Sequence, residues 1–283
     1  MREKLNRFAN NVTSQYGEDG ILEYILNHAS SEIIHTACEF GAWDGKFLSN
    51  IYTLWHDKGW VAVLIEADLS KYNSLIEKYN QYKNIHCLNY FVDPKGDNSL
   101  DSIFERNEIE FNIGILSIDI DSLDYFIWKY LDRVTPQIVI IEYNNTIPPF
   151  IDYHDPEGEC FLRCSAKALE SLGNIKGYKL ICCTVTNAIF VKNNVFNRDY
   201  FPDMPVEYLF DYEGQRKNNT LEPTVVGSQF ITSFPVFVSN PPKHLRLYYN
   251  IKKSMARVFK GGPKRVPPSK DVMRQLKKAG LYI

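Results

Sequence analysis

The sequence has no apolar run long enough to span a membrane, although 45% of its 283 residues are hydrophobic. Residues 1–19 include basic side chains but no apolar h-region and no small-residue cleavage site, so we expect no signal peptide. The sequence also lacks internal repeats, low-complexity tracts and an excess of glycine or proline. These absences argue against a membrane-spanning, fibrous or disordered protein. They predict a soluble, cytoplasmic chain with one sizeable core.

Several sequence signatures of common sites are also missing. None of the six cysteines forms a CxxC pair, and most lie in apolar stretches, so we expect small buried hydrophobes in a reducing compartment rather than a zinc site. There is no G-x-G-x-x-G fingerprint, no P-loop and no Ser/His/Asp nucleophile elbow. The chemistry must therefore come from another arrangement of residues.

The small net charge of -2 hides an uneven distribution. Residues 243–283 carry twelve Lys or Arg and a single acid, Asp271, which gives this tail a charge of about +11. The rest of the chain has 20 Lys or Arg and 33 acids, a charge of about -13. The acidic body and the basic tail are expected to serve different purposes.

Apolar runs alternate with helix-like segments along the first half of the chain. Near-continuous apolar runs are typical of parallel strands covered on both faces, and they occur at 32–40, 59–67, 84–92, 112–120 and 136–144. Helix-like patterns follow at 46–57, 68–80, 99–106, 122–132 and 161–175. This alternation predicts a doubly wound α/β sheet.

Two further apolar runs, 178–185 and 187–193, are too close together to hold a helix between them, so they predict an antiparallel hairpin. A parallel sheet finished by such a hairpin is typical of the Rossmann-like, seven-stranded sheet of class I methyltransferases. We therefore expect a core over 1–193 and an irregular insertion over 194–240, as a lid or an interface. A basic C-terminal appendage is expected over 241–283.

The segment CEFGAWDGKFLSN (38–50) places glycines between a strand and a helix-like pattern. Gly41 and Gly45 allow a tight turn and close approach of the backbone to a ligand. Glu39 and Asp44 would repel a phosphate and suit a cationic ligand, such as the sulfonium and ammonium groups of S-adenosylmethionine. The alternative is an ordinary glycine turn.

Glu66 ends the second apolar run, 21 residues after Gly45. In Rossmann-like folds, an acid at about this spacing binds ribose hydroxyls. A helix cap is the alternative, but Asp68 suits that purpose better. Asp93, after the third run, is either a partner for the adenine amino group or a turn residue before Pro94.

Oxygen-bearing side chains follow the fourth and fifth apolar runs. The carboxyl ends of neighbouring parallel strands meet at one edge of a sheet, and carboxylate and amide oxygens suit Mg²⁺ or Mn²⁺. This predicts a metal site from Asp119, Asp121, Glu142 and Asn144, beside Asn145. Alternatively, Asp121 or Ser122 caps the next helix. Asp124 falls in the first turn of that helix and is not assigned to the site.

Two further groups of polar residues are candidates for the site. In SQYGEDGILEYIL (14–26), Glu18 and Asp19 suit the N-terminal dipole of a helix, and Gln15 and Tyr16 are candidates to close over the cofactor. His154 is either a general base or a solvated histidine in a loop.

The chain resembles FkbM-type S-adenosylmethionine-dependent methyltransferases, in the branch of bacterial surface-polysaccharide and natural-product pathways. The resemblance runs in order from about residue 13 to 193. Its motifs are SQYGEDGILEYIL, CEFGAWDGKFLSN, VLIEADLSKY, LSIDIDSLDYFIW, VIIEYNNTIPP and GYKLICCTVTNAIFV.

The resemblance implies methyl transfer to a hydroxyl oxygen. It implies cofactor contacts from Glu39, Gly41, Asp44 and Glu66, with the neighbouring Ala42, Gly45 and Ala67. Metal-dependent O-methyltransferases of this fold take ligands from the ends of the fourth and fifth strands. The comparable residues here are Asp119, Glu142 and Asn144, with Asp121 and Asn145 as additions.

The chain departs from the family pattern at two places beside the expected acceptor pocket. Ser122 and Leu123 stand where Gly-Asn is expected. FLRCSAKAL (161–169) replaces a small Gly-Ser type segment and introduces Arg163. Arg163 either binds an anionic group of the substrate or lies on the surface at a helix start.

The sequence thus predicts a metal-assisted O-methyltransferase acting on a small metabolite or sugar, with or without a phosphate. Its candidate catalytic residues are Asp119, Glu142 and His154. Its candidate substrate-binding residues are Asn145 and Arg163. The rival is a non-catalytic scaffold whose basic tail docks to an anionic membrane surface or an acidic partner. The acidic body disfavours nucleic acid as a substrate, and a homo-oligomer formed through 194–240 is left open.

Overall fold

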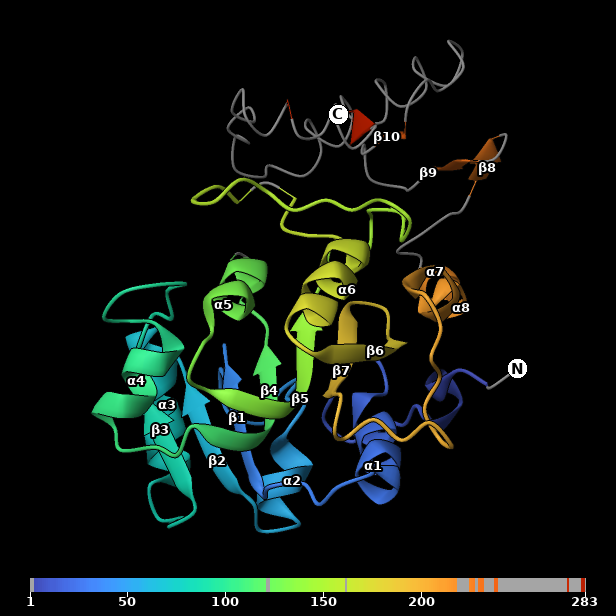
Figure 1. Cartoon of the computed structure of the whole chain (residues 1–283). Helices are drawn as coiled ribbons and strands as arrows, with labels where there is room; N and C mark the ends of the chain where they lie inside the picture. The colour runs from blue at the N-terminus through green and yellow to red at the C-terminus, as the bar shows by residue number, and fades with distance from the viewer. Residues whose placement is uncertain are drawn as a thin grey trace.

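The computed structural model describes residues 3–120, 123–160, 162–217, 224–226, 229–231, 237–238, 274 and 281–282. One seven-stranded sheet, in the order β3-β2-β1-β4-β5-β7-β6, forms its centre (Figure 1). The strands are β1 (Thr36–Phe40), β2 (Val61–Ile65), β3 (Ile85–Leu88), β4 (Asn112–Ile118), β5 (Thr135–Glu142), β6 (Tyr178–Cys183) and β7 (Asn187–Lys192).

Strands β1 to β5 pair in parallel, and β7 runs antiparallel between β5 and β6. This strand order, with its antiparallel β7, is the Rossmann-like arrangement of class I methyltransferases. The fold class predicted from the apolar runs and the short hairpin is therefore confirmed. The strand order reverses between β1 and β4, and ligands of open α/β sheets bind beside such a reversal.

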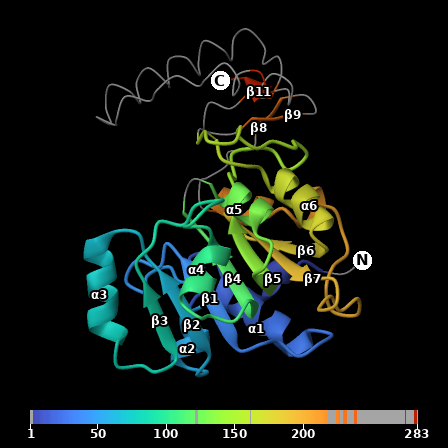
Figure 2. The ribbon, with the colours of Figure 1, turned by 60° about the vertical axis from the view of Figure 1, so that its left-hand side comes forward.

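Helices cover both faces of the sheet (Figures 1 and 2). One buried cluster joins the sheet to the 3₁₀ helix η1 (Leu5–Phe8), α1 (Glu18–His28), α2 (Tyr52–His56) and α3 (Leu69–Tyr79). The other joins it to α4 (Leu100–Arg106), α5 (Asp124–Tyr130), α6 (Ala166–Ile175) and α7 (Val206–Leu209). In β5, Val139 and Ile141 face one cluster, and Ile138 and Ile140 face the other. This two-sided burial explains the continuous apolar runs.

The chain after β7 adds further side chains to these two clusters. Val195 and Phe201 are buried on one face, and Val206 and Phe210 on the other. The short helices α7 and α8 (Tyr212–Lys217) follow β7, so the expected insertion is not wholly irregular. Two antiparallel pairs complete the described elements: β8 (Thr224–Val226) with β9 (Gln229–Ile231), and β10 (Phe237–Val238) with β11 (Leu281–Tyr282). Most of the basic tail lies outside the described residues.

Two helices begin later than the sequence pattern predicts. The predicted helix 46–57 is helical only from Tyr52, because Gly45 and Leu48 adopt left-handed backbone angles, with φ of 76° and 59°. The predicted helix 161–175 begins at Ala166, where the Ser165 hydroxyl caps it by accepting from the Ala168 N–H. Arg163, with φ of 63°, lies just before that cap and cannot continue a right-handed helix.

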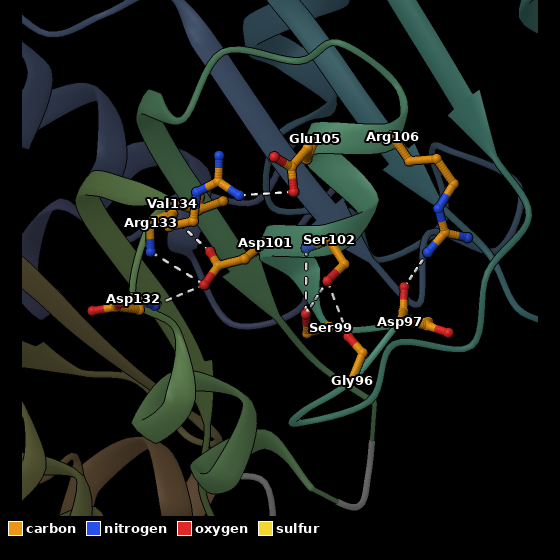
Figure 3. Close-up of polar contacts among 10 residues, drawn as sticks. All are labelled: Gly96, Asp97, Ser99, Asp101, Ser102, Glu105, Arg106, Asp132, Arg133 and Val134. Atoms are coloured by element: carbon orange, nitrogen blue, oxygen red, sulfur yellow. Dashed lines mark hydrogen bonds and ion pairs between the residues drawn. The ribbon is translucent and has the colours of Figure 1, made fainter.

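A polar cluster fixes α4 to the turn that leads into β5 (Figure 3). The Asp101 carboxylate accepts hydrogen bonds from the backbone N–H groups of Asp132, Arg133 and Val134, at 3.0, 3.1 and 2.8 Å. Ser99 caps the same helix by accepting from the Ser102 N–H. These bonds satisfy backbone donors that the turn leaves without partners, and they set where β5 begins. No helix in the described ranges is both long and apolar enough to cross a membrane.

Candidate cofactor and acceptor site

A cavity of about 400 Å³ opens at the carboxyl ends of β1, β2 and β4, where the strand order reverses. Its size falls in the range of about 300–1,000 Å³ that is usual for small-molecule sites. The lining residues are Glu39, Phe40, Gly41, Ala42, Trp43, Phe47, Leu48, Ser49, Asn50, Ile65, Glu66, Ala67, Lys71, Tyr90, Phe91, Val92, Asp119 and Ile120. Five of the ten predicted cofactor residues and one predicted metal ligand, Asp119, line this cavity. The five are Glu39, Gly41, Ala42, Glu66 and Ala67.

Gly41 lets the loop after β1 lie directly against the end of β4. Its φ of 79° is left-handed, and a Cβ at this position would collide with the backbone carbonyl oxygen of Asp119. The N–H groups of Gly41 and Ala42 both donate to the Ile65 carbonyl, at 3.1 Å each, which ties the same loop to β2. The close approach expected of this glycine is therefore made to the protein's own backbone.

Glu39 is a buried carboxylate held by its own chain. It is 6% exposed, and it accepts hydrogen bonds from the Ser49 hydroxyl at 2.6 Å and from the Asn50 N–H at 2.9 Å. Burial raises the pKa of this carboxyl, and the hydrogen bonds from Ser49 and Asn50 partly offset that rise. Sequence reasoning missed both partners, although they close the same motif.

Glu66 presents a fixed carboxylate at the end of β2. It is 6% exposed and lines the cavity, and its two oxygens accept from the N–H groups of Trp43 and Asp68, at 2.8 Å each. An ionised carboxylate has about four acceptor positions, so it can still accept from a ligand hydroxyl. Asp68 caps α3 by accepting from the Lys71 N–H at 2.9 Å, as its position predicts.

An apolar rim surrounds the cavity, and sequence reasoning did not identify it. Trp43, Phe47 and Phe91 line the cavity with 48%, 56% and 57% of their surfaces exposed. The Lys71 ammonium lies 4.3 Å from the centre of the Trp43 ring. Exposed aromatic faces beside a cavity suit a planar ligand group such as a purine. The only signal in the sequence is the aromatic pair within GAWDGKF.

The other predicted cofactor residues lie outside the cavity lining. Asp44 accepts from the N–H groups of Lys46 and Phe47, and its other oxygen pairs with the Lys78 ammonium at 3.0 Å. These hydrogen bonds and the Lys78 charge outweigh the effect of burial and lower the pKa of Asp44. Gly45 lies beside Asp44 in the same turn, and Asp93 directly follows the lining residue Val92. Asp44 therefore shapes the loop rather than facing the cavity.

The two acids of SQYGEDG are buried anchors rather than exposed partners of the helix dipole. One oxygen of Glu18 accepts from the Thr184 hydroxyl at 2.6 Å and from the Asn187 amide at 3.0 Å, and the other accepts from the Tyr16 N–H at 2.8 Å. Glu18 thereby ties the start of α1 to the β6–β7 hairpin. The Gln15 amide donates to the Tyr16 hydroxyl at 3.1 Å, and Gln15 itself is exposed.

Asp19 holds the segment before α1 in place. One of its oxygens accepts from the N–H groups of residues 12, 13 and 14, at 2.9, 2.9 and 2.8 Å, and from the Ser14 hydroxyl at 2.7 Å. The Thr13 hydroxyl in turn donates to the Ser49 carbonyl at 3.1 Å. Since the Ser49 hydroxyl binds Glu39, this segment braces one wall of the cavity.

The polar residues at the end of β5 are engaged within the protein. The Arg163 guanidinium forms an ion pair with the Glu142 carboxylate, and the two side chains are 23% and 11% exposed. The Asn144 carbonyl oxygen accepts from the N–H and the hydroxyl of Thr146, at 2.9 and 2.6 Å. The Asn145 amide donates to the Gln215 side chain at 2.9 Å.

These contacts test whether the predicted metal donors suit a divalent cation. An amide oxygen has two lone pairs, and Thr146 uses both positions on Asn144. Glu142 is already paired with the Arg163 guanidinium, and Asp121 lies outside the described residues. In the part of the chain that is described, no group of three or more His, Cys, Asp or Glu side chains is arranged to hold a metal. The described donors therefore do not fit the predicted metal site.

Three more residues near this edge have defined surroundings. Asp124 accepts from the Ile120 N–H at 2.9 Å and begins α5, so it fixes the loop after β4, consistent with its exclusion from the site. The His154 ring stacks on Tyr125 with the centres 4.3 Å apart, and its Nδ1 lies 2.7 Å from the Asp155 carbonyl oxygen. Burial, then the charges of Glu18 and Glu142, raise the pKa of the Tyr16 phenol.

No family model and no curated protein matches the chain. Among solved structures, a SAM-dependent methyltransferase from Aquifex aeolicus is 16% identical, with 62% of this chain and 90% of that chain covered and a TM-score of 0.36. A methyltransferase from Clostridium acetobutylicum ATCC 824 is 10% identical, with coverages of 62% and 90% and a TM-score of 0.39. The glycopeptide N-methyltransferase MtfA, solved with S-adenosyl-L-homocysteine, is 10% identical, with coverages of 63% and 90% and a TM-score of 0.35.

The strand order of this chain itself shows the class I methyltransferase fold. The resemblance to FkbM-type methyltransferases stays a prediction from the sequence motifs.

Proposed function

We propose that the protein is an S-adenosylmethionine-dependent methyltransferase that methylates a hydroxyl of a small metabolite or sugar, with or without a phosphate. The observation that carries the proposal is the Glu66 carboxylate. Two backbone N–H groups fix it at the rim of a cavity of about 400 Å³, beside the Gly41 loop. The bacterial surface-polysaccharide or natural-product setting comes only from the sequence resemblance.

The residues of the cavity suit each part of S-adenosylmethionine. Glu66 has acceptor positions left for the two ribose hydroxyls. The exposed ring of Phe91, beside Tyr90 and Val92, suits the adenine. The acidic residue Glu39 suits the cationic end of the ligand. When bound, the cofactor supplies an electrophilic methyl group and leaves as S-adenosylhomocysteine.

Asp119 directly follows β4 and lines the cavity. In the proposal it orients the acceptor hydroxyl and takes its proton as the new carbon–oxygen bond forms. Correct placement of the acceptor supplies most of the acceleration in such a transfer. Glu142 and His154, also predicted as catalytic from the sequence, are not assigned a step. The predicted metal is not carried into the proposal, because Glu142 and Asn144 are engaged by Arg163 and Thr146.

A methyl-transfer screen against hydroxylated and phosphorylated sugars and small metabolites, with labelled S-adenosylmethionine, tests this function. Asp119→Asn should abolish turnover while leaving cofactor affinity nearly unchanged. Asp97→Asn, an exposed carboxylate away from the cavity lining, is the matched control and should keep full turnover. Unchanged turnover in Asp119→Asn would remove Asp119 from the mechanism.

The basic tail stays a separate proposal about location. Its twelve Lys or Arg residues suit an anionic membrane surface. Cosedimentation with anionic vesicles should be lost when residues 241–283 are deleted, while cofactor binding by the core is retained. Loss of both would instead make the tail part of the folded unit.

A further inference from the structure

Arg163 lies where the sequence predicts a metal ion. Its Nη1 contacts a Glu142 oxygen at the end of β5, and the pair is mostly withdrawn from solvent, with 23% of the Arg163 side chain and 11% of the Glu142 side chain exposed. Charges in such a setting interact more strongly than on an open surface. The Glu142 carboxylate, which the sequence assigns to a divalent cation, thus lies beside the monovalent Arg163 guanidinium.

The backbone around Arg163 is built to keep it there. Its φ of 63° is unusual for a residue with a long side chain, so the surroundings must hold it. Its N–H donates to the buried Asp155 carboxylate at 2.6 Å, and its carbonyl accepts from the Asp155 N–H at 2.8 Å.

The residues on either side of Arg163 are joined to the end of β5. The Asn144 amide donates to the Leu162 carbonyl at 2.9 Å, and the Asn144 N–H donates to the Cys164 carbonyl at 2.8 Å. Asn144 is therefore committed to positioning the arginine loop, and its own oxygen is committed to Thr146. Asn144, one predicted metal ligand, thus helps to place the Arg163 guanidinium beside Glu142, another predicted metal ligand.

We propose that Arg163 excludes a divalent metal from Glu142 and supplies the positive charge at the end of β5, so that methyl transfer needs no divalent metal. Arg163 acts on Glu142 alone and is assigned no step in the transfer. A metal cation at the Glu142 carboxylate would have to displace the Arg163 guanidinium or bind despite the electrostatic repulsion between the two positive charges. The part about methyl transfer rests on the proposed function, whereas the exclusion of metal does not.

Titration of the full chain with Mn²⁺, followed by electron paramagnetic resonance, tests the exclusion without any cofactor or acceptor. Arg163→Gly removes the guanidinium and suits the left-handed backbone, and Arg163→Lys keeps a positive charge as the matched control. We expect Arg163→Gly to bind Mn²⁺ at least about tenfold more tightly than the wild type, because a like charge is removed. A further Glu142→Gln substitution should abolish this gain, and Arg163→Lys should not show it.

A merely structural arginine would give no gain in metal affinity on removal, so an unchanged or weaker affinity in Arg163→Gly contradicts the proposal. The wild type provides a second test that needs no arginine variant. If it binds Mn²⁺ and Glu142→Gln weakens that binding, Glu142 is a metal ligand and the proposal fails. Turnover should persist in EDTA. Absence of cofactor binding would refute the proposed methyl transfer, while the Mn²⁺ titrations would still decide the exclusion.

Discussion

The buried Glu39 carboxyl should make stability depend on pH. Burial raises its folded-state pKa above the usual value of 4.5, so the folded protein holds this proton more tightly than the unfolded chain. The favourable contribution is therefore present below pH 4.5 and is lost as pH rises through the folded pKa. The melting temperature of the wild type minus that of Glu39→Gln should fall over this window. A difference that grows with pH would contradict the assignment.

Gly41 provides a prediction about backbone geometry. Gly41→Ala combines a left-handed φ of 79° with a collision at the Asp119 carbonyl, so it should lower the free energy of unfolding by more than about 2 kcal/mol. Gly59→Ala is the matched control, since its φ of 71° is similar but no atom lies near the new Cβ. It should cost only about 1 kcal/mol. Urea denaturation measures both, and equal costs would rule out the close approach.

Among the elements, the segment before α1 depends most on one side chain. Asp19→Ala removes the acceptor of three backbone N–H groups and the Ser14 hydroxyl, and should lower the free energy of unfolding by about 2–4 kcal/mol. Hydrogen exchange at residues 12–14 should accelerate as well. Glu23→Ala, an exposed position on the same helix, is the control and should change neither. Unchanged exchange at 12–14 would show that Asp19 does not hold the segment.

The sequence predicts the sheet well because each strand is encoded by a local run of apolar residues. Continuous apolar runs and the short gap before residue 187 are enough to indicate five parallel strands and a hairpin. The starts of α2 and α6 are not predictable in this way, because they depend on left-handed residues such as Leu48 and Arg163. Tertiary contacts, rather than propensity, hold those residues in place.

The site is predicted less completely, because its key contacts join distant parts of the chain. Glu18 meets Thr184 across 166 positions, and Arg163 meets Glu142 across 21. A sequence shows the acids but not which cation or donor will lie beside each one. Glu39 lies near the end of β1 and Glu66 directly follows β2, so both line the cavity beside the reversal point. The sequence pattern does indicate these positions.

At the scale of the whole molecule, the two buried clusters fix a sheet whose strand order reverses between β1 and β4, and the cavity lies at that reversal. The loops after β1, β2 and β4 all contribute to its lining. The central claim is that this cavity binds S-adenosylmethionine through Glu66.

Isothermal titration calorimetry with S-adenosylmethionine tests that claim most directly. The account predicts saturable binding to the wild type and at least about tenfold weaker binding to Glu66→Ala, because two charge-assisted hydrogen bonds are lost. Glu77→Ala, an exposed acid on α3, should bind like the wild type, and melting curves without ligand should show that each variant is folded. No saturable binding to the wild type, or equal affinity in folded Glu66→Ala, would contradict the account.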